Sequence, residues 1–385
     1  MSVQPERQDA RHFLTREPLI LTVLSALALA FFFAVSALSH IYHTQQESLG
    51  QRWFSRGVVD LKGQRYQAAV TDFRTALLYS RDSYDYQLSL AEALLGLKRS
   101  NEAHAYLINL WDRQPENGQV NLELARIAAQ NGETNRALRY YHNAIYATWP
   151  GDQESQRRDT RFELIEFLLK INFKEQAQAE LIALAANLPD DPALQTRTGE
   201  LFLQAQDFEH ALSAYRQGVR ADRHNAAANA GAGTAAFELG RYALAQRYLS
   251  AAVAANRDDT QSAATLRTTE MALQLDPFQR GLSAARRSRS VLEAFAAAGD
   301  RIKSCSSINA SSAIRSNTAA QPALEDSWKK LKPRLSEQSL RRDPELVEST
   351  MDLVFNIERQ TSSTCGPAVG KDLALLLIAK LHEGN

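Results

Sequence analysis

The sequence lacks a net charge and lacks the residue spacings that build metal centres. Lys and Arg together number 44, and so do Asp and Glu, so the formal net charge is +0. This balance gives no reason to expect a nucleic-acid partner, because such proteins carry a strongly basic face. The 8 histidines are scattered, with no His-Glu-x-x-His or Cys-x-x-Cys spacing. We therefore expect neither a metal ion nor a cofactor.

The sequence also lacks a convincing phosphate-binding loop. Residues 366–372 (GPAVGKD) are one residue short of that motif, and no Ser or Thr follows Lys371. Gly231 and Gly233 match part of a dinucleotide fingerprint, but they fall inside a predicted helix, where we interpret them as packing residues. Nothing ties one serine to one histidine, so no catalytic residue is nominated and the chain is not expected to be an enzyme.

Cysteine is scarce, since Cys305 and Cys365 are the only two. If this part of the chain is exported, a disulfide between them is expected. The bridge would close a loop of about 60 residues, worth up to roughly 4 kcal/mol in the chain-entropy model. In a reducing cytoplasm both would be ordinary thiols.

One long apolar run stands near the N-terminus, over residues 19–38. Twenty helical residues rise roughly 30 Å, which matches the hydrocarbon core of a bilayer. Arg7, Arg11 and Arg16 precede the run, and the nearest basic residue after it is Arg52. Because positive charge stays on the cytoplasmic side, we predict a cytoplasmic tail over residues 1–17 and a membrane-spanning helix over 18–41.

The rest of the chain is then expected outside the cytoplasm, in the periplasm, and joined to the membrane helix by a short linker over residues 40–50. Two alternatives stay open for the apolar run. The first is a cleaved signal peptide, for which Val35-Ser36-Ala37 would serve as the cleavage site. The second is the buried helix of a soluble protein.

Small residues recur at a fixed spacing through residues 50–258. Gly57, Ala91, Ala125, Gly199 and Gly233 form one series. A second series follows at a constant offset and comprises Ala69, Ala103, Ala137, Ala177, Ala211 and Ala245. Successive members of the second series lie 34 residues apart except for one step of 40 between Ala137 and Ala177, which we assign to a polar, turn-rich insertion over residues 149–159. A fixed period of this length predicts a stacked array of units.

Each unit resembles the tetratricopeptide repeat (TPR), a pair of antiparallel helices. In the first unit the marked positions are Trp53, Gly57, Tyr66, Ala69, Phe73 and Ala76. The resemblance implies an all-α, right-handed solenoid of about six repeats, near residues 50–83, 84–117, 118–151, 158–191, 192–225 and 226–259. A C-terminal helical domain over 260–385 would follow. The whole layout resembles single-pass bacterial repeat proteins of envelope-assembly or translocon-associated chaperone type.

The resemblance also implies a concave groove lined by the first helix of each pair. The candidate groove contacts are Phe54, Val58, Leu88, Glu92, Leu122, Arg126, Phe162, Glu166, Glu200 and Leu203. The Lys and Asn clamp with which some arrays hold C-terminal carboxylates is absent from the equivalent positions. A mixed apolar and acidic surface suits an amphipathic helix or an extended segment with basic side chains. The alternative is that these carboxylates only solvate an exposed face.

In the C-terminal region we predict helices over residues 261–275, 277–303, 322–335, 343–360 and 370–382, with a loop over 304–321. Asp276 and Pro277 are read as the N-cap and first residue of the long helix, and Cys305 as its end. Arg280, Arg286, Arg287 and Arg289 share one region of that helix. They would bind anionic lipid or an acidic partner, or form a solvated face.

Three functional hypotheses follow. The first is a membrane-anchored, non-enzymatic scaffold of the cell envelope that binds protein partners through the groove. The second is an enzymatic or ligand-binding C-terminal domain with the array as docking arm, which a pocket formed by Arg286, Arg289 and Cys305 would favour. The third places the array in the cytoplasm as an adaptor.

Overall fold

The computed structural model describes residues 10–311 and 320–382. The described chain is built from helices, and its residues divide into two compact units between Leu164 and Ile165, within one helix. Each unit is described by itself below. The tail predicted over residues 1–17 lies outside the described residues at positions 1–9.

Six helix pairs follow one another from residue 50 onward, as the period predicts. Their helices are α1 (Ala10–Lys62), α2 (Tyr66–Tyr79), α3 (Tyr84–Gly96), α4 (Ser100–Arg113), α5 (Gly118–Gln130), α6 (Thr134–Tyr146), α7 (Gln153–Lys170), α8 (Lys174–Ala185), α9 (Pro192–Gln204), α10 (Phe208–Ala221), α11 (Ala226–Glu238) and α12 (Tyr242–Ala255). The C-terminal part of α1 supplies the first helix of the first pair. The predicted all-α repeat architecture is confirmed.

The turn inside each pair repeats with the same period. One residue per turn has a left-handed backbone, and these residues are Gln64 (φ 57°), Lys98 (60°), Gly132 (75°), Asn172 (62°), Gln206 (62°) and Gly240 (69°). Glycine adopts this conformation without steric cost, whereas the other four side chains tolerate a strained position. The six turns mark the same six repeats as the small residues do.

Small residues allow helices to meet over aromatic rings. A Cβ added to Gly231 would clash with the ring of Tyr215 at 2.1 Å, and one added to Gly57 would clash with the ring of Phe73 at 2.6 Å. Ala69, Ala103, Ala137, Ala177, Ala211 and Ala245 are all fully buried. Close approach of the helix backbones is thus the physical reason for the periodic pattern.

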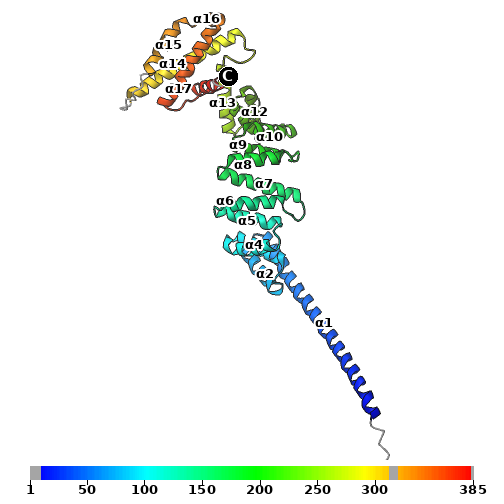
Figure 1. The fold of residues 1–385 in the computed structure, drawn as a ribbon. Coiled ribbons are helices and arrows are strands. Elements are labelled where there is room, and N and C mark those ends of the chain that lie inside the picture. The colour runs from blue at the N-terminus through cyan, green and yellow to red at the C-terminus, as the bar shows by residue number, and fades with distance from the viewer. Residues whose placement is uncertain (1–9, 312–319, 383–385) are drawn as a thin grey trace, which may run out of the picture. The chain divides into compact units, whose positions relative to one another are not determined.

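Helix α1 runs without a break from the apolar run into the first repeat (Figure 1). The linker predicted over residues 40–50 is therefore wrong. This stretch is polar but contains no proline, and Gly50 at its end packs against Tyr79 and Tyr86, so the helix continues into the first pair. Of the described residues, α1 alone is long and apolar enough to cross a membrane. Its apolar side chains are exposed, for example Phe31 at 72% and Leu38 at 69%.

The insertion predicted over residues 149–159 is only partly irregular. Helix α7 begins at Gln153, so the polar stretch that follows forms helical turns. Before it, Thr148 donates its N–H to the carbonyl oxygen of Glu116 at 2.9 Å. Trp149 is buried, with its indole against Gly118 and its Nε1 donating to the carbonyl oxygen of Ala144 at 2.8 Å. The first residues of the insertion therefore pack on the third helix pair, before the fourth pair begins with α7.

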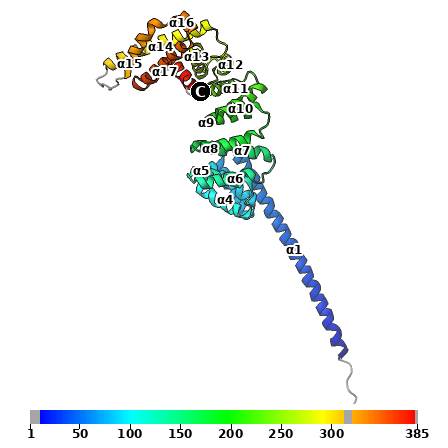
Figure 2. The same ribbon diagram turned by 45° about the horizontal axis from the view of Figure 1, so that its top comes forward.

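The C-terminal helices are α13 (Thr260–Leu275), α14 (Ala284–Ser311), α15 (Ala320–Leu331), a 3₁₀ turn η1 (Lys332–Arg334), α16 (Glu337–Arg342), α17 (Pro344–Thr364) and α18 (Lys371–His382). Both ribbon views show α14, α15, α16 and α17 grouped together (Figures 1 and 2). Their shared core includes Val291, Phe295, Trp328, Met351 and Ile378, and it extends to Tyr242 of the last repeat. The run 373–381 contributes to this core, as expected.

Two boundaries predicted for the long helix are wrong. Pro277 does not start it, because the Asp276 carboxylate accepts the N–H of Phe278 at 2.9 Å in a local turn, and the helix begins at Ala284. The predicted loop over 304–321 is helical as far as Ser311, so Cys305 lies inside α14 rather than at its end. Residues 312–319 of that loop lie outside the described residues.

We expect the buried alanine positions to be intolerant of larger side chains. Ala211→Leu should lower the free energy of unfolding by about 1–3 kcal/mol, because extra methyl groups must displace packed neighbours. Ala251→Leu, at an exposed position inside α12, is the matched control and should change it by about 0.5 kcal/mol or less. Chemical denaturation followed by circular dichroism measures both. Equal effects would contradict the packing explanation.

Candidate functional site

Side chains from the first helices of three consecutive repeats meet in unit 1. Arg126 of α5 donates through Nε to Glu163 of α7 at 2.9 Å and forms an ion pair with Glu123, one turn earlier on α5, at 2.6 Å. Gln119 of α5 donates through its amide to the carboxylate of Glu92 on α3. We call Glu92, Gln119, Glu123, Arg126 and Glu163 the first-helix cluster. It contains three carboxylates and one guanidinium.

Glu92 is the most perturbed carboxyl group of this cluster. Burial, reinforced by the nearby Glu123 carboxylate, raises its pKa to about 7, although Gln119 and Arg126 act in the opposite direction. Burial also raises the pKa of Glu123. The first-helix cluster therefore changes its charge near neutral pH, where ionisation of Glu92 adds a negative charge to a cluster that holds one cation.

The structure brings some predicted groove residues together and leaves others apart. Phe54 stacks on Tyr86 with ring centroids 4.6 Å apart, and Val58, Leu88 and Leu203 are half-buried. Leu122 is 8% exposed and Phe162 is 0% exposed, so neither offers appreciable surface to a partner.

Two predicted acidic groove residues lie in unit 2 and are exposed. Glu166 forms an ion pair with Arg197 at 2.7 Å, which links α7 to α9, and Glu200 lies one turn farther along α9.

Reasoning from sequence missed Gln119, Glu123 and Glu163. A helical spacing of three residues links Glu123 to Arg126 and was a usable signal. The contact of Arg126 with Glu163 spans 37 residues, because the insertion displaces the period at this point. Counting 34 residues on from Arg126 therefore does not reach its partner on the first helix of the next repeat.

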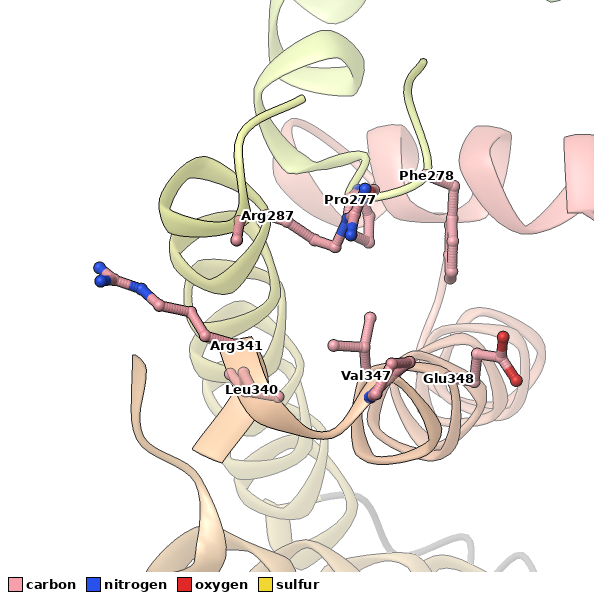
Figure 3. Close-up of a pocket in the computed structure, with 9 residues that line it drawn as sticks. Pro277, Phe278, Arg287, Leu340, Arg341, Val347 and Glu348 are labelled. Carbon is pink, nitrogen blue, oxygen red and sulfur yellow. The ribbon is translucent and has the colours of Figure 1, made fainter. Parts of the chain in front are cut away.

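Two cavities are found among the described residues of the C-terminal region. The first, of about 220 Å³, is lined by Pro277, Phe278, Ala284, Arg287, Leu340, Arg341, Pro344, Val347 and Glu348. Figure 3 shows Arg341 and Glu348 at opposite sides of it, with Leu340 and Val347 between them. Arg341 is already paired with Glu337, and Arg287 donates through Nε to the carbonyl oxygen of Pro277 at 3.2 Å. The second cavity, of about 560 Å³, includes Arg286 and Arg289 in its lining.

The pocket hypothesised from Arg286, Arg289 and Cys305 is found only in part. Both arginines line the second cavity, but Cys305 lines neither one. It lies 16 residues beyond Arg289 on the same helix, a rise of roughly 24 Å. Cys305 is 1% exposed and forms a disulfide with Cys365 across a Cα–Cα distance of 5.5 Å. Its position makes it a structural bridge, not a pocket residue.

A buried carboxyl group lies near this disulfide. Glu358 of α17 is fully buried, and neither of its carboxyl oxygens has a hydrogen-bond partner. Burial, with a contribution from the Asp372 carboxylate, raises its pKa to about 8, against the opposing charge of Arg301. Arg301 itself donates to the carbonyl oxygen of Gly366 at 2.6 Å and lies 3.7 Å from Asp372. Glu358 is therefore protonated at neutral pH.

Among the described residues, no group of three or more His, Cys, Asp or Glu side chains is placed to hold a metal ion.

The described chain defines a class of protein, an array of helix pairs with a helical C-terminal region. Two tetratricopeptide repeat models match its sequence, one over residues 54–107, 88–153 and 168–226 and the other over 202–268. The chain belongs to the tetratricopeptide repeat family, whose members mediate protein–protein interactions.

Several solved structures are similar to parts of the chain. YrrB, a TPR protein with an unusual peptide-binding site, is 15% identical, with a TM-score of 0.40 over 50% of this chain and 95% of its own. PilW, a type IV pilus biogenesis factor, is 17% identical, with a TM-score of 0.40 over 57% and 98%. The C-terminal part of a repeat protein from Cytophaga hutchinsonii is 11% identical, with a TM-score of 0.47 over 62% and 92%. No curated protein matches.

The buried carboxyl group predicts a pH-dependent stability. Because the pKa of Glu358 is raised, the folded protein keeps this proton between about pH 4.5 and 8, where the unfolded chain has lost it. Its contribution is most favourable below pH 4.5 and is lost as the pH rises through 8. Glutamine carries no charge at either pH. The difference in unfolding free energy between Glu358→Gln and the parent protein should therefore shift in favour of the variant by roughly 2–4 kcal/mol as the pH is raised from 4 to 8.

Urea unfolding at both pH values measures this difference. Glu348→Gln replaces an exposed glutamate on the same helix and should show almost no pH-dependent gain. A Glu358→Gln variant whose stability relative to the parent protein is the same at both pH values would contradict the assignment.

Proposed function

We propose that this protein is a non-enzymatic, membrane-anchored scaffold that binds basic segments of partner proteins through the first helices of its repeats. The observation that carries the proposal is the first-helix cluster, where Glu123 and Glu163 pair with the single guanidinium of Arg126 and the Glu92 carboxylate is held only by the neutral amide of Gln119. Surplus negative charge in a half-buried setting favours a cationic ligand.

The apolar neighbours of the cluster support a peptide as that ligand. Leu88 and Leu95 are half-buried on α3, the helix that carries Glu92. A partner segment with alternating basic and aliphatic side chains would match this surface. Phe162 and Leu122 are left out of the proposed contacts because they are buried.

We further propose that the apolar part of α1 anchors the protein and that the repeats lie outside the cytoplasm. The arginines at positions 7, 11 and 16 precede the apolar run, and none follows it before Arg52. The disulfide between Cys305 and Cys365 supports the same topology, because such bonds persist in oxidising compartments. The domain boundaries predicted from sequence, with an array over 50–258 and a domain over 260–385, are retained in this proposal.

Topology is tested by reporters fused after Asn385. Alkaline phosphatase, which requires export, should be active, whereas green fluorescent protein at the same position should remain dark. Mass spectrometry without reduction should find Cys305 and Cys365 linked in the native protein. A fluorescent cytoplasmic reporter together with free thiols would overturn the proposed location.

Partner binding is tested by crosslinking in the native membrane, with captured proteins identified by mass spectrometry. Glu92→Lys should abolish capture of a specific partner, because it places a cation where a basic segment would bind. Glu175→Lys makes the same charge change at an exposed position on α8, a second helix of its pair, and should leave capture intact.

Two results would count against the groove. Equal capture by Glu92→Lys and the parent protein would do so, and so would an equal loss of capture in Glu92→Lys and Glu175→Lys.

A synthetic peptide of alternating Lys and Leu should bind the purified chain more tightly at pH 8 than at pH 6, since Glu92 ionises between these two pH values. Glu92→Gln should remove that pH dependence.

A further inference from the structure

The larger C-terminal cavity, of about 560 Å³, lies at the start of α14. Its walls come from α12, α13, the connection over residues 276–283 and the first turns of α14. Arg286 and Arg289 line it one helical turn apart, with Ala243, Leu273 and Leu282 supplying apolar surface. A cavity of this size accommodates several side chains of a ligand rather than one small ion.

Both arginines are exposed, and neither forms an ion pair with any carboxylate in the described part of the chain. Helical spacing places Glu293 four residues after Arg289, where a carboxylate ordinarily pairs with such a cation. Here Glu293 is held elsewhere. Lys371 of α18 donates to it at 2.7 Å, and the amide of Gln274 donates to both of its oxygens at 2.9 Å. The fold thus keeps Arg289 unpaired.

Two other polar side chains of the cavity, Ser290 and Gln279, already donate to backbone carbonyl groups. Ser290 donates to the carbonyl oxygen of Gln274 at 2.7 Å, and the amide of Gln279 donates to the carbonyl oxygens of Leu273 and Asp276. Arg289 uses only its Nε, which donates to the carbonyl oxygen of Ala285 at 3.3 Å. The terminal guanidinium nitrogens therefore remain as charged donors for a ligand, and their natural acceptors are carboxylates.

We propose that this cavity is a second binding site, which takes an acidic segment of a partner protein. Carboxylate side chains of the segment pair with Arg286 and Arg289, and its aliphatic side chains contact Leu273 and Leu282. The site has the opposite polarity from the first-helix cluster and does not depend on it. The protein would then hold two oppositely charged segments at separate places.

The test is fluorescence anisotropy with the full chain purified in a non-ionic detergent. The probe is a rhodamine-labelled, C-terminally amidated peptide of sequence Leu-Glu-Leu-Glu-Leu, compared with Leu-Gln-Leu-Gln-Leu. The glutamate peptide should bind, and replacement of both glutamates by glutamine should weaken binding at least about tenfold. Its affinity should fall as salt is raised.

The paired variant Arg286→Glu/Arg289→Glu should weaken the glutamate peptide by at least about tenfold. Arg280→Glu changes an exposed arginine that does not line the cavity and should leave the affinity within about twofold. Unchanged binding by the paired variant, equal weakening by Arg280→Glu, or no binding to the parent protein would each overturn the proposal. If the paired variant does not fold, Arg286→Gln/Arg289→Gln provides the same comparison.

Discussion

The close approach of helix backbones over aromatic rings is the constraint on which the repeat structure depends. Tyr215 shows it most clearly, because Cβ atoms added to Gly199 or Gly231 would both meet its ring. One tyrosine therefore packs against helices α9 and α11 at once. Because such positions serve packing, the periodic residues explain how the array forms, and binding depends on the positions between them.

The same reasoning explains what sequence could predict. Packing positions such as Ala211 recur with a period, so the stacked units could be found by counting, and their resemblance to the tetratricopeptide repeat implied the helix pairs. Helix ends were harder, because they depend on single hydrogen bonds. Asp276 and Pro277 match a helix start by residue type, yet the Asp276 carboxylate bonds to Phe278 and the helix begins later, at Ala284. The polar stretch before Gly50 resembled a linker because polarity alone does not separate an exposed helix from a loop.

For the candidate sites, the sequence predicts which residues lie on a given side of a helix, but it does not predict which side chains they contact. Glu92 and Arg126 could be named from their positions, but the ratio of three carboxylates to one guanidinium arises from side chains on three helices. The arginines of α14 are visible in the sequence as a cluster of basic residues. That Arg289 stays unpaired follows from the contact of Glu293 with Lys371, which lies 78 residues away in the chain. No local pattern reports such a partner.

The continuity of α1 has a mechanical consequence for a membrane-anchored protein. Between Leu38 and Gly50 the helix rises roughly 18 Å without a break, so no flexible tether separates the apolar run from the first repeat. Gly50 then packs against Tyr79 and Tyr86, which fixes the helix to the first pair. With the apolar run in a bilayer, the tilt and rotation of that helix would set the orientation of the first repeat. Any partner bound at the first-helix cluster of unit 1 would then be held at a defined angle to the membrane, which a glycine-rich linker could not provide.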